Sequence, residues 1–222
     1  MRKLRPQFDW QAWGERVQSH ADTLEPFREF VGEFFGFVAA NDPPPDGGYT
    51  RRPQFGIRLD VGDSLDLAVR PKWSPPHKRY DYTQDRNAVE IVKPGEIDPE
   101  VIDLELLPEG RSPVLALRLG PDQVKNIGRV FYDHDKNSRH LRIVVDTAHR
   151  LLMDPKTVFS QAGQSGRCVC CRRVLTDAVS RTRGIGPECI RWFGSFLDSK
   201  PSDSVEKYRQ QYLAETGFFP GR

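Results

Sequence analysis

Apolar residues recur at intervals of three and four positions near the start of the chain. The pattern predicts a helix with one wide apolar stripe, which we expect to pack in the core rather than form a ligand groove. The positions of the stripe are Leu24, Phe27, Phe30, Val31, Phe34, Phe35 and Val38. Three prolines and two glycines within residues 41–48 end this helix in a loop.

The middle of the chain changes to the alternating pattern of strands. Residues 55–61 alternate strictly, and residues 65–70 follow after a Gly62-Asp63 turn, so an antiparallel hairpin is predicted. Residues 101–106 and 114–119 are further strand candidates. Residues 70–88 are rich in Pro, Lys, Arg, Tyr and Asp, which favours a long exposed loop.

The pattern after residue 120 predicts mixed elements. A short helix is expected to begin at residues 120–122, with an apolar face of Val124, Ile127, Val130 and Phe131, and residues 141–145 are expected to return as a strand. A final amphipathic helix is predicted over residues 204–215, and the apolar tail, residues 216–220, is expected to dock back on a domain.

These elements predict an α+β protein made of two parts. A Gly/Ser/Gln stretch, residues 160–166, has the composition of a linker. We therefore expect a mixed N-terminal domain, residues 1–158, that carries an antiparallel sheet and flanking helices. Residues 159–222 contain all four cysteines of the chain, the residue type that most often binds structural zinc, and would form a small C-terminal zinc finger with a terminal helix.

Composition and charge restrict the class of protein. The chain has 222 residues, of which 37% are hydrophobic and 29% charged, as is typical of soluble globular proteins. No run approaches the ~18 apolar residues that cross a bilayer, and the basic residues 1–6 lead into no apolar segment of a secretory signal. We expect a cytoplasmic protein without a membrane partner, where clustered thiols favour metal over disulfides.

All four cysteines lie close together in the C-terminal part. Cys168 and Cys171 form a Cys-x-x-Cys knuckle, which aims two soft thiolates at one point. Cys189 follows a Gly-Ile-Gly-Pro turn whose Pro187 suits the first turn of a helix, and the positive end of that helix favours a thiolate. A hairpin, with residues 174–177 as its first arm or turn, fits the gap between them. The pattern predicts one structural Zn²⁺ site; reduced cysteines without metal are the alternative.

The fourth ligand of this zinc site stays open. Structural zinc usually takes four protein ligands, and only three cysteines have suitable spacing. Cys170 is the fourth cysteine, but adjacent Cys170 and Cys171 point their side chains differently. His140 or His149 from the preceding domain, Asp177 or a water molecule are the other candidates.

The cysteine segment also carries a specific motif. Its positions are Cys168, Cys171, Arg173, Leu175, Thr176, Asp177, Ser180, Gly184, Ile185, Gly186, Pro187 and Cys189. The motif resembles that of a small uncharacterised zinc-binding domain family of actinobacterial and bacteriophage proteins, and the knuckle, hairpin and helix together resemble a treble-clef finger. The resemblance covers about residues 166–193 and implies zinc binding and a phage or mobile-element origin, without an established activity.

The basic residues around the glycine turn point to a polyanion. Residues 161–222 contain ten Lys/Arg and six Asp/Glu, a net charge of +4. Gly-Ile-Gly-Pro turns also occur in helix-hairpin-helix motifs, where backbone amides approach a phosphate. The candidate phosphate contacts are Arg172, Arg173, Arg181, Arg183 and Arg191, and Trp192 and Phe193 follow them. Alternatively, the glycines only give the chain room beside the metal, and the two aromatic residues belong to the core.

The sequence therefore favours a non-enzymatic nucleic-acid-binding or adaptor protein. The alternative is a protein–protein interaction or inhibitor module in which zinc is purely structural and residues 70–88 or the aromatic helix form the contact. Asp133-His134-Asp135 could serve as a general base, but a solvated turn after a helix explains it better. The chain lacks the motifs of common hydrolases and phosphate-binding loops, and a zinc nuclease would need a histidine after the knuckle. We expect no catalytic residues and no small-molecule substrate.

Overall fold

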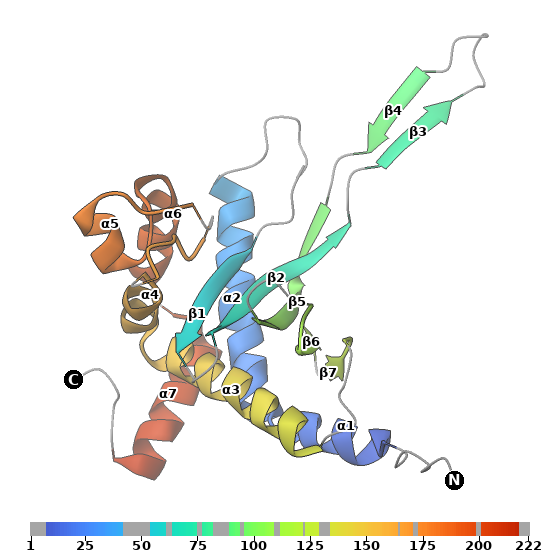
Figure 1. The fold of residues 1–222 in the computed structure, drawn as a ribbon, viewed down its shortest axis with the longest axis vertical. Coiled ribbons are helices and arrows are strands. Elements are labelled where there is room, and N and C mark those ends of the chain that lie inside the picture. The colour runs from blue at the N-terminus through green and yellow to red at the C-terminus, as the bar shows by residue number, and fades with distance from the viewer. Residues whose placement is uncertain are drawn as a thin grey trace.

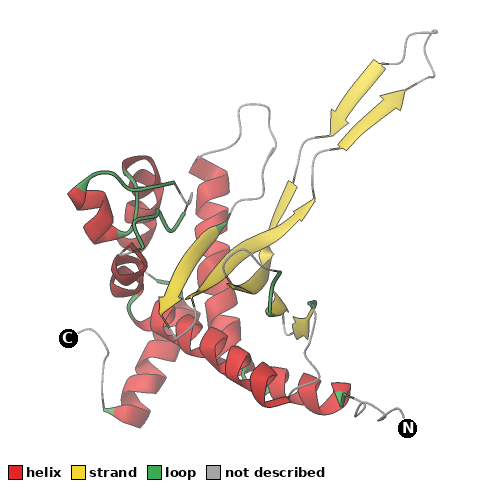
Figure 2. Ribbon diagram, in the orientation of Figure 1, coloured by secondary structure: helices red, strands yellow, loops and turns green. Residues whose placement is uncertain are grey.

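The computed structural model describes residues 8–41, 54–60, 64–74, 77–81, 89–93, 96–108, 112–121, 123–128, 134–163, 165–170, 173–198 and 201–217. These residues form helices, a five-stranded antiparallel sheet and a two-stranded ribbon (Figures 1 and 2). The predicted α+β class, with an antiparallel sheet and flanking helices, is confirmed. No helix in the described ranges is long and apolar enough to cross a membrane.

Two helices occupy the N-terminal region. Helix α1 (Trp10–Gln18) begins after Asp9, whose side chain accepts a hydrogen bond from the Ala12 amide at 2.9 Å. Helix α2 (Ala21–Asn41) carries the predicted apolar stripe, and the stripe is buried from Leu24 to Phe35. The prediction of a core helix is confirmed; the side chain of Val38 lies outside the described residues.

The main sheet has the strand order β1-β2-β5-β6-β7, with every neighbouring pair antiparallel. Its strands are β1 (Phe55–Asp60), β2 (Ser64–Ser74), β5 (Glu96–Pro108), β6 (Leu115–Gly120) and β7 (Gln123–Asn126). The predicted hairpin and the two further strands are confirmed. Alternate residues of β1, β2, β5 and β6 are buried in the core, because successive side chains of a strand point to opposite faces.

The opposite face of the sheet carries charged pairs between neighbouring strands. These ion pairs are Arg58–Asp66, Arg70–Glu105 and Arg118–Asp103. Both Arg118–Asp103 hydrogen bonds are short, 2.7 and 2.9 Å, and Asp103 is only 2% exposed. Carboxylates therefore hold the guanidinium groups of this face in place.

A second ribbon, β3 (His77–Asp81) paired with β4 (Val89–Lys93), continues the β2–β5 hairpin and projects from the sheet (Figure 1). The prediction of a loop over residues 70–88 is therefore wrong for residues 70–74 and 77–81. The strand register shifts between Pro71 and Lys72, and such a bulge accommodates a proline inside a strand. Residues 82–88 lie outside the described residues.

Two predictions in the third quarter of the chain are also wrong. The segment after residue 120 forms β7 instead of a helix, because Pro121 lies in a tight turn that returns the chain along β6; Val130 and Phe131 are outside the described residues. Residues 141–145 belong to helix α3 (His134–Met153), not to a strand. His134 and Asp135 begin this helix instead of following one, and Asp133 is not described.

The C-terminal part is helical on both sides of the cysteines. Its helices are α4 (Pro155–Gly163), α5 (Ala178–Arg183), α6 (Pro187–Asp198) and α7 (Asp203–Thr216). The predicted linker is wrong for residues 160–163, which finish α4; this helix buries Val158 and Phe159. The predicted terminal helix is confirmed as α7, and residues 218–220 of the apolar tail are outside the described residues.

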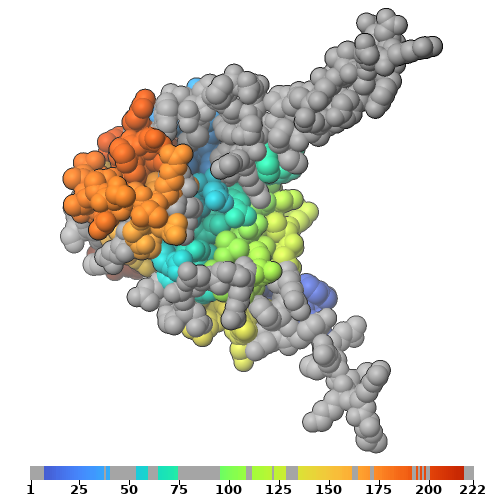
Figure 3. Space-filling model, turned by 45° about the horizontal axis from the view of Figure 1, so that its top comes forward, coloured from blue at the N-terminus to red at the C-terminus, as the bar shows by residue number. Residues whose placement is uncertain are grey.

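The hydrophobic core continues across residue 158, the predicted end of the first domain. The Phe159 ring of α4 packs against Phe55 of β1 with 6.1 Å between centroids. The Gly56 amide of β1 donates a 2.7 Å hydrogen bond to the carbonyl of Val169, between two cysteines. In Figure 3 the residues of the cysteine segment (orange) lie beside those of the sheet (cyan to green). The domain boundary itself stays a prediction.

Candidate metal centre

Three cysteine sulfurs converge in the C-terminal part. The Sγ atoms of Cys168, Cys170 and Cys189 all lie within 4.8 Å of one another. Tetrahedral zinc with Zn–S bonds of ~2.3 Å would set its sulfurs ~3.8 Å apart, so a small adjustment lets one ion bind all three. Cys171, which the spacing predicts as a ligand, lies outside the described residues. The three described thiols are thus arranged to bind a metal ion.

Local backbone contacts form the turn that carries Cys168 and Cys170. The Cys168 amide donates to the Arg173 carbonyl at 2.9 Å, and the Leu175 amide donates to the Gly166 carbonyl at 2.8 Å. Gly166 has a φ of 71°, a conformation that favours glycine. These bonds join Gly166 and Cys168 to Leu175 and Arg173, and so hold the described residues on either side of the turn together.

Cys189 lies in the first turn of α6, which begins at Pro187 as predicted. The turn before α6 also contacts the cluster: the Gly186 amide donates a hydrogen bond to Cys168 Sγ at 3.3 Å. Gly184 has a φ of 73° and ends α5 in the left-handed conformation. The Gly-Ile-Gly-Pro turn therefore directs one backbone amide at a cysteine sulfur.

The segment between the cysteines differs from the predicted hairpin. One isolated bridge joins Arg167 and Val174, and α5 then replaces the second arm. Asp177 begins α5: its carboxylate accepts a 2.7 Å hydrogen bond from the Ser180 amide, and this bond lowers the pKa of Asp177. The cap explains why a helix forms here, and it gives Asp177 a structural role away from the sulfurs.

The other candidates for a fourth ligand also lie elsewhere. Within the described ranges no histidine or carboxylate joins the three sulfurs. His149 instead contacts the Tyr208 hydroxyl with its Nδ1 atom at 2.7 Å. His140 is buried in α3. The proposals of Asp177, His140 and His149 as ligands are therefore wrong for this arrangement, which leaves Cys171 and water.

Ionisation of the clustered cysteines is unfavourable when no cation is bound. Hydrogen bonds to Cys168 and Cys189, together with burial, raise the pKa of Cys170 well above its ordinary value. Three thiolates cannot lie this close in a buried site unless a cation compensates them. Metal binding would therefore release protons from the cysteines.

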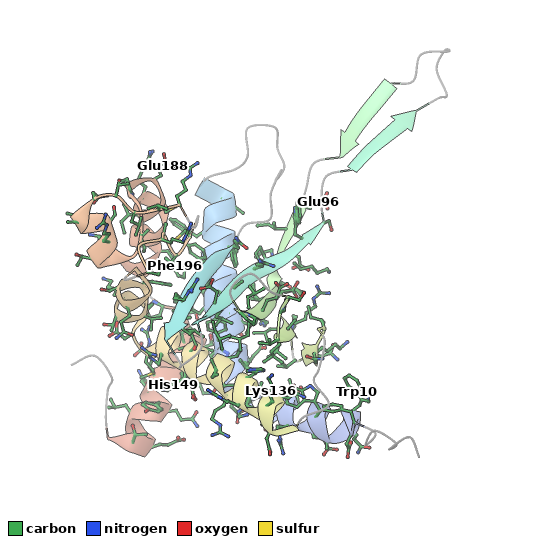
Figure 4. All side chains as sticks on the ribbon, in the orientation of Figure 1. Trp10, Glu96, Lys136, His149, Glu188 and Phe196 are labelled. Carbon is green, nitrogen blue, oxygen red and sulfur yellow. The ribbon has the colours of Figure 1, made fainter. Side chains whose placement is uncertain are left out.

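The predicted phosphate contacts have different surroundings. The Arg181 guanidinium donates to the carbonyls of Leu175 and Thr176, so it supports the turn before α5. Arg173 is exposed and pairs with Glu188 at 2.9 Å; Glu188 is labelled at the outer surface in Figure 4.

The remaining predicted contacts divide into two groups. Arg183 and Arg191 are exposed. Arg172 and the side chains of Trp192 and Phe193 lie outside the described residues. The structure therefore places the exposed side chains of Arg183 and Arg191 on α5 and α6.

Comparison with known families yields one match. Residues 160–193 match the model of a family of unknown function (DUF6011), and the three clustered cysteines lie within the match. Neither curated proteins nor solved structures give a match. The fold and the site thus define the class: an α+β protein with a C-terminal cysteine cluster that can bind a metal ion.

Proposed function

We propose that the protein is a non-enzymatic nucleic-acid-binding protein whose C-terminal module is a zinc finger. The convergence of the Cys168, Cys170 and Cys189 sulfurs supports the zinc finger, and the exposed arginines around it support the nucleic-acid partner. Thiolates are soft ligands that suit Zn²⁺, and sites made mainly of cysteine usually have a structural role. Cys171 or water would complete the coordination. Zinc would stabilise the turn, while the protein surface around it binds the partner.

The charge of the module supports a polyanionic partner. Residues 160–193 contain six arginines and two carboxylates, a net charge of +4. The five described arginines of this segment are all exposed: Arg167, Arg173, Arg181, Arg183 and Arg191. Exposed cations that neutralise phosphates release condensed counterions, which makes binding favourable and sensitive to salt.

Arg183 is the best residue with which to test the phosphate contact. It lies in the last turn of α5 and forms no ion pair with any other described residue. Arg142, exposed on α3, offers the same charge outside the module. Arg183→Glu and Arg142→Glu therefore make equal changes in net charge at two different places.

The experiment measures anisotropy of labelled single-stranded and duplex DNA and RNA at several salt concentrations. We expect Arg183→Glu to weaken binding several-fold and to reduce the slope of log K against log salt. Arg142→Glu should have a much smaller effect. Equal binding by both variants and the wild type would reject the nucleic-acid proposal.

A protein partner is the second candidate, because the same module exposes two large apolar side chains. Val174 is 62% exposed and Val179 is 57% exposed. Exposed apolar side chains within one small module are candidate contacts for a protein partner. A partner retained after nuclease treatment by the wild type, but lost by the Val174→Ser/Val179→Ser double variant, would favour this candidate.

A further inference from the structure

A groove of about 820 Å³ lies outside the metal module. Its walls are the corner between α1 and α2, the start of the edge strand β7, and one face of α7. The volume falls within the range of sites for small ligands. No residue of the cysteine segment lines this groove, so its ligand need not be the partner of the module.

The α7 wall presents two tyrosines held by neighbouring helices. The Tyr208 hydroxyl lies 2.7 Å from His149 Nδ1 and 3.4 Å from Thr23 Oγ1. The Tyr212 ring lies 4.5 Å from the His149 ring, measured between centroids. His149 is on α3, where α7 lies beside it (Figure 4). The contacts from α2 and α3 thus fix Tyr208, and His149 supports both rings.

Negative charge predominates among the lining residues. Three carboxylates, Asp22, Glu25 and Glu215, face one ammonium group, that of Lys207. Glu25 is neutralised by Arg28, at 2.6 Å. Asp22 on α2 and Glu215 on α7 therefore supply negative charge from two different walls.

Lys207 is the one positive charge that α7 contributes to the described lining, and the histidine behind the tyrosines adds none at neutral pH. Burial lowers the pKa of His149, so its imidazole is neutral there. Burial raises the pKa of Tyr208 despite the opposing hydrogen bond with Thr23, so the phenol is uncharged at neutral pH. Such a wall disfavours anionic ligands and favours cations.

Tyrosine faces next to carboxylates attract organic cations through two effects. The electron-rich ring face attracts an ammonium group, and the carboxylate pairs with it. We propose that this groove binds a linear alkylammonium ligand, whose terminal ammonium groups pair with Asp22 and Glu215 while its chain lies along Tyr208 and Tyr212. The ligand is either a free polyamine or the lysine side chains of a peptide, which present the same chemistry.

Calorimetric titration with spermidine tests the site directly. We expect wild-type binding that Glu215→Gln and Asp22→Asn each weaken by about threefold to tenfold. Tyr212→Leu should also weaken it, and Lys207→Gln should strengthen it because a repelling cation is removed. Glu206→Gln is the matched control: it makes the same charge change on the same helix, outside the groove lining.

A second titration, with an amidated trilysine peptide, separates the two sources. Tighter binding of spermidine identifies a free polyamine, and tighter binding of the peptide identifies a lysine-bearing segment; both outcomes support the site. Absence of binding by either ligand overturns the proposal. Equal weakening by Glu206→Gln and Glu215→Gln also overturns it, because the effect would then be bulk charge. Circular dichroism of each variant verifies that it is folded.

Discussion

Substitution of Phe196 by alanine tests whether the metal module and the body share one core. Phe196 and Cys189 are seven residues apart on α6, so they lie on the same side of this helix. The Phe196 ring is 7% exposed and packs against α2, with centroids 5.3 Å from both Phe30 and Phe34. The label in Figure 4 places it between the module and α2.

The loss can be estimated from this environment. Phenylalanine-to-alanine changes in protein cores cost about 3–5 kcal/mol. Because Phe196 lies near the edge of the core, we expect the low end, about 3 kcal/mol. In a chain of this size, 1 kcal/mol corresponds to roughly 2–4 °C, so the melting temperature should fall by about 6–12 °C. Val179→Ala, at a side chain that is 57% exposed, should change stability by less than about 0.5 kcal/mol.

Urea unfolding of the cobalt-loaded protein provides two signals for this test. Thiolate-to-cobalt absorbance follows the cysteine site, and far-ultraviolet circular dichroism follows the helices of the whole chain. If the core is shared, Phe196→Ala shifts both transitions by the same amount. A shift of the cobalt signal alone, or a total loss below about 0.5 kcal/mol, would refute the reasoning.

Three further results are expected from stability measurements. A Cβ on Gly32 would lie 2.7 Å from a carbonyl oxygen of β5, whereas a Cβ on Gly36 would meet nothing within 4 Å. Thermal melts should therefore show that Gly32→Ala lowers the stability by about 1–2 kcal/mol. Gly36→Ala should raise it by about 0.5–1 kcal/mol, because alanine favours a helix more than glycine does. Arg118→Met leaves Asp103 buried without its bidentate partner, so urea titration should show a loss of about 1–2 kcal/mol, and no loss would contradict the assigned ion pair. Burial lowers the pKa of His149 in the folded protein below its usual 6.5. The contribution of the neutral imidazole to the free energy of unfolding is therefore complete above pH 6.5 and is lost as the pH falls toward the folded pKa. His149→Gln should flatten this part of the stability–pH profile.

The elements that the sequence predicts correctly have strong and regular patterns. The apolar stripe of α2 is long enough to distinguish a helix from a strand. The alternation of apolar and polar residues in β1 and β2, with Gly62-Asp63 between them, likewise predicts both strands and their pairing. Pro187 marks the start of α6, and thereby the position of Cys189, because proline fits the first helical turn.

The failures occur where local preference and tertiary packing disagree. Residues 141–145 contain Ile143, Val144 and Val145, β-branched residues that favour strands. They are nevertheless helical, because the buried positions from Leu141 to Leu152 follow the period of a helix. A window of five residues is too short to reveal that period.

The metal site shows a different limit. Spacing alone favours Cys171 over Cys170, yet the structure places the Cys170 sulfur beside Cys168 and Cys189. Whether the Cys170 side chain points toward the other two sulfurs depends on the conformation of the turn, and the turn depends on bonds such as that from the Gly56 amide to the Val169 carbonyl. This bond joins residues far apart in the sequence, so no local motif reports it.

Zinc X-ray absorption of the purified protein, together with its metal content, tests the central claim most directly. We predict one zinc per chain, coordinated by at least three sulfurs at ~2.3 Å, with loss of the metal in Cys168→Ser and Cys189→Ser. Protein that is folded and retains no metal, or a bound metal without sulfur neighbours, would contradict the proposal that the cysteine cluster is a structural zinc site.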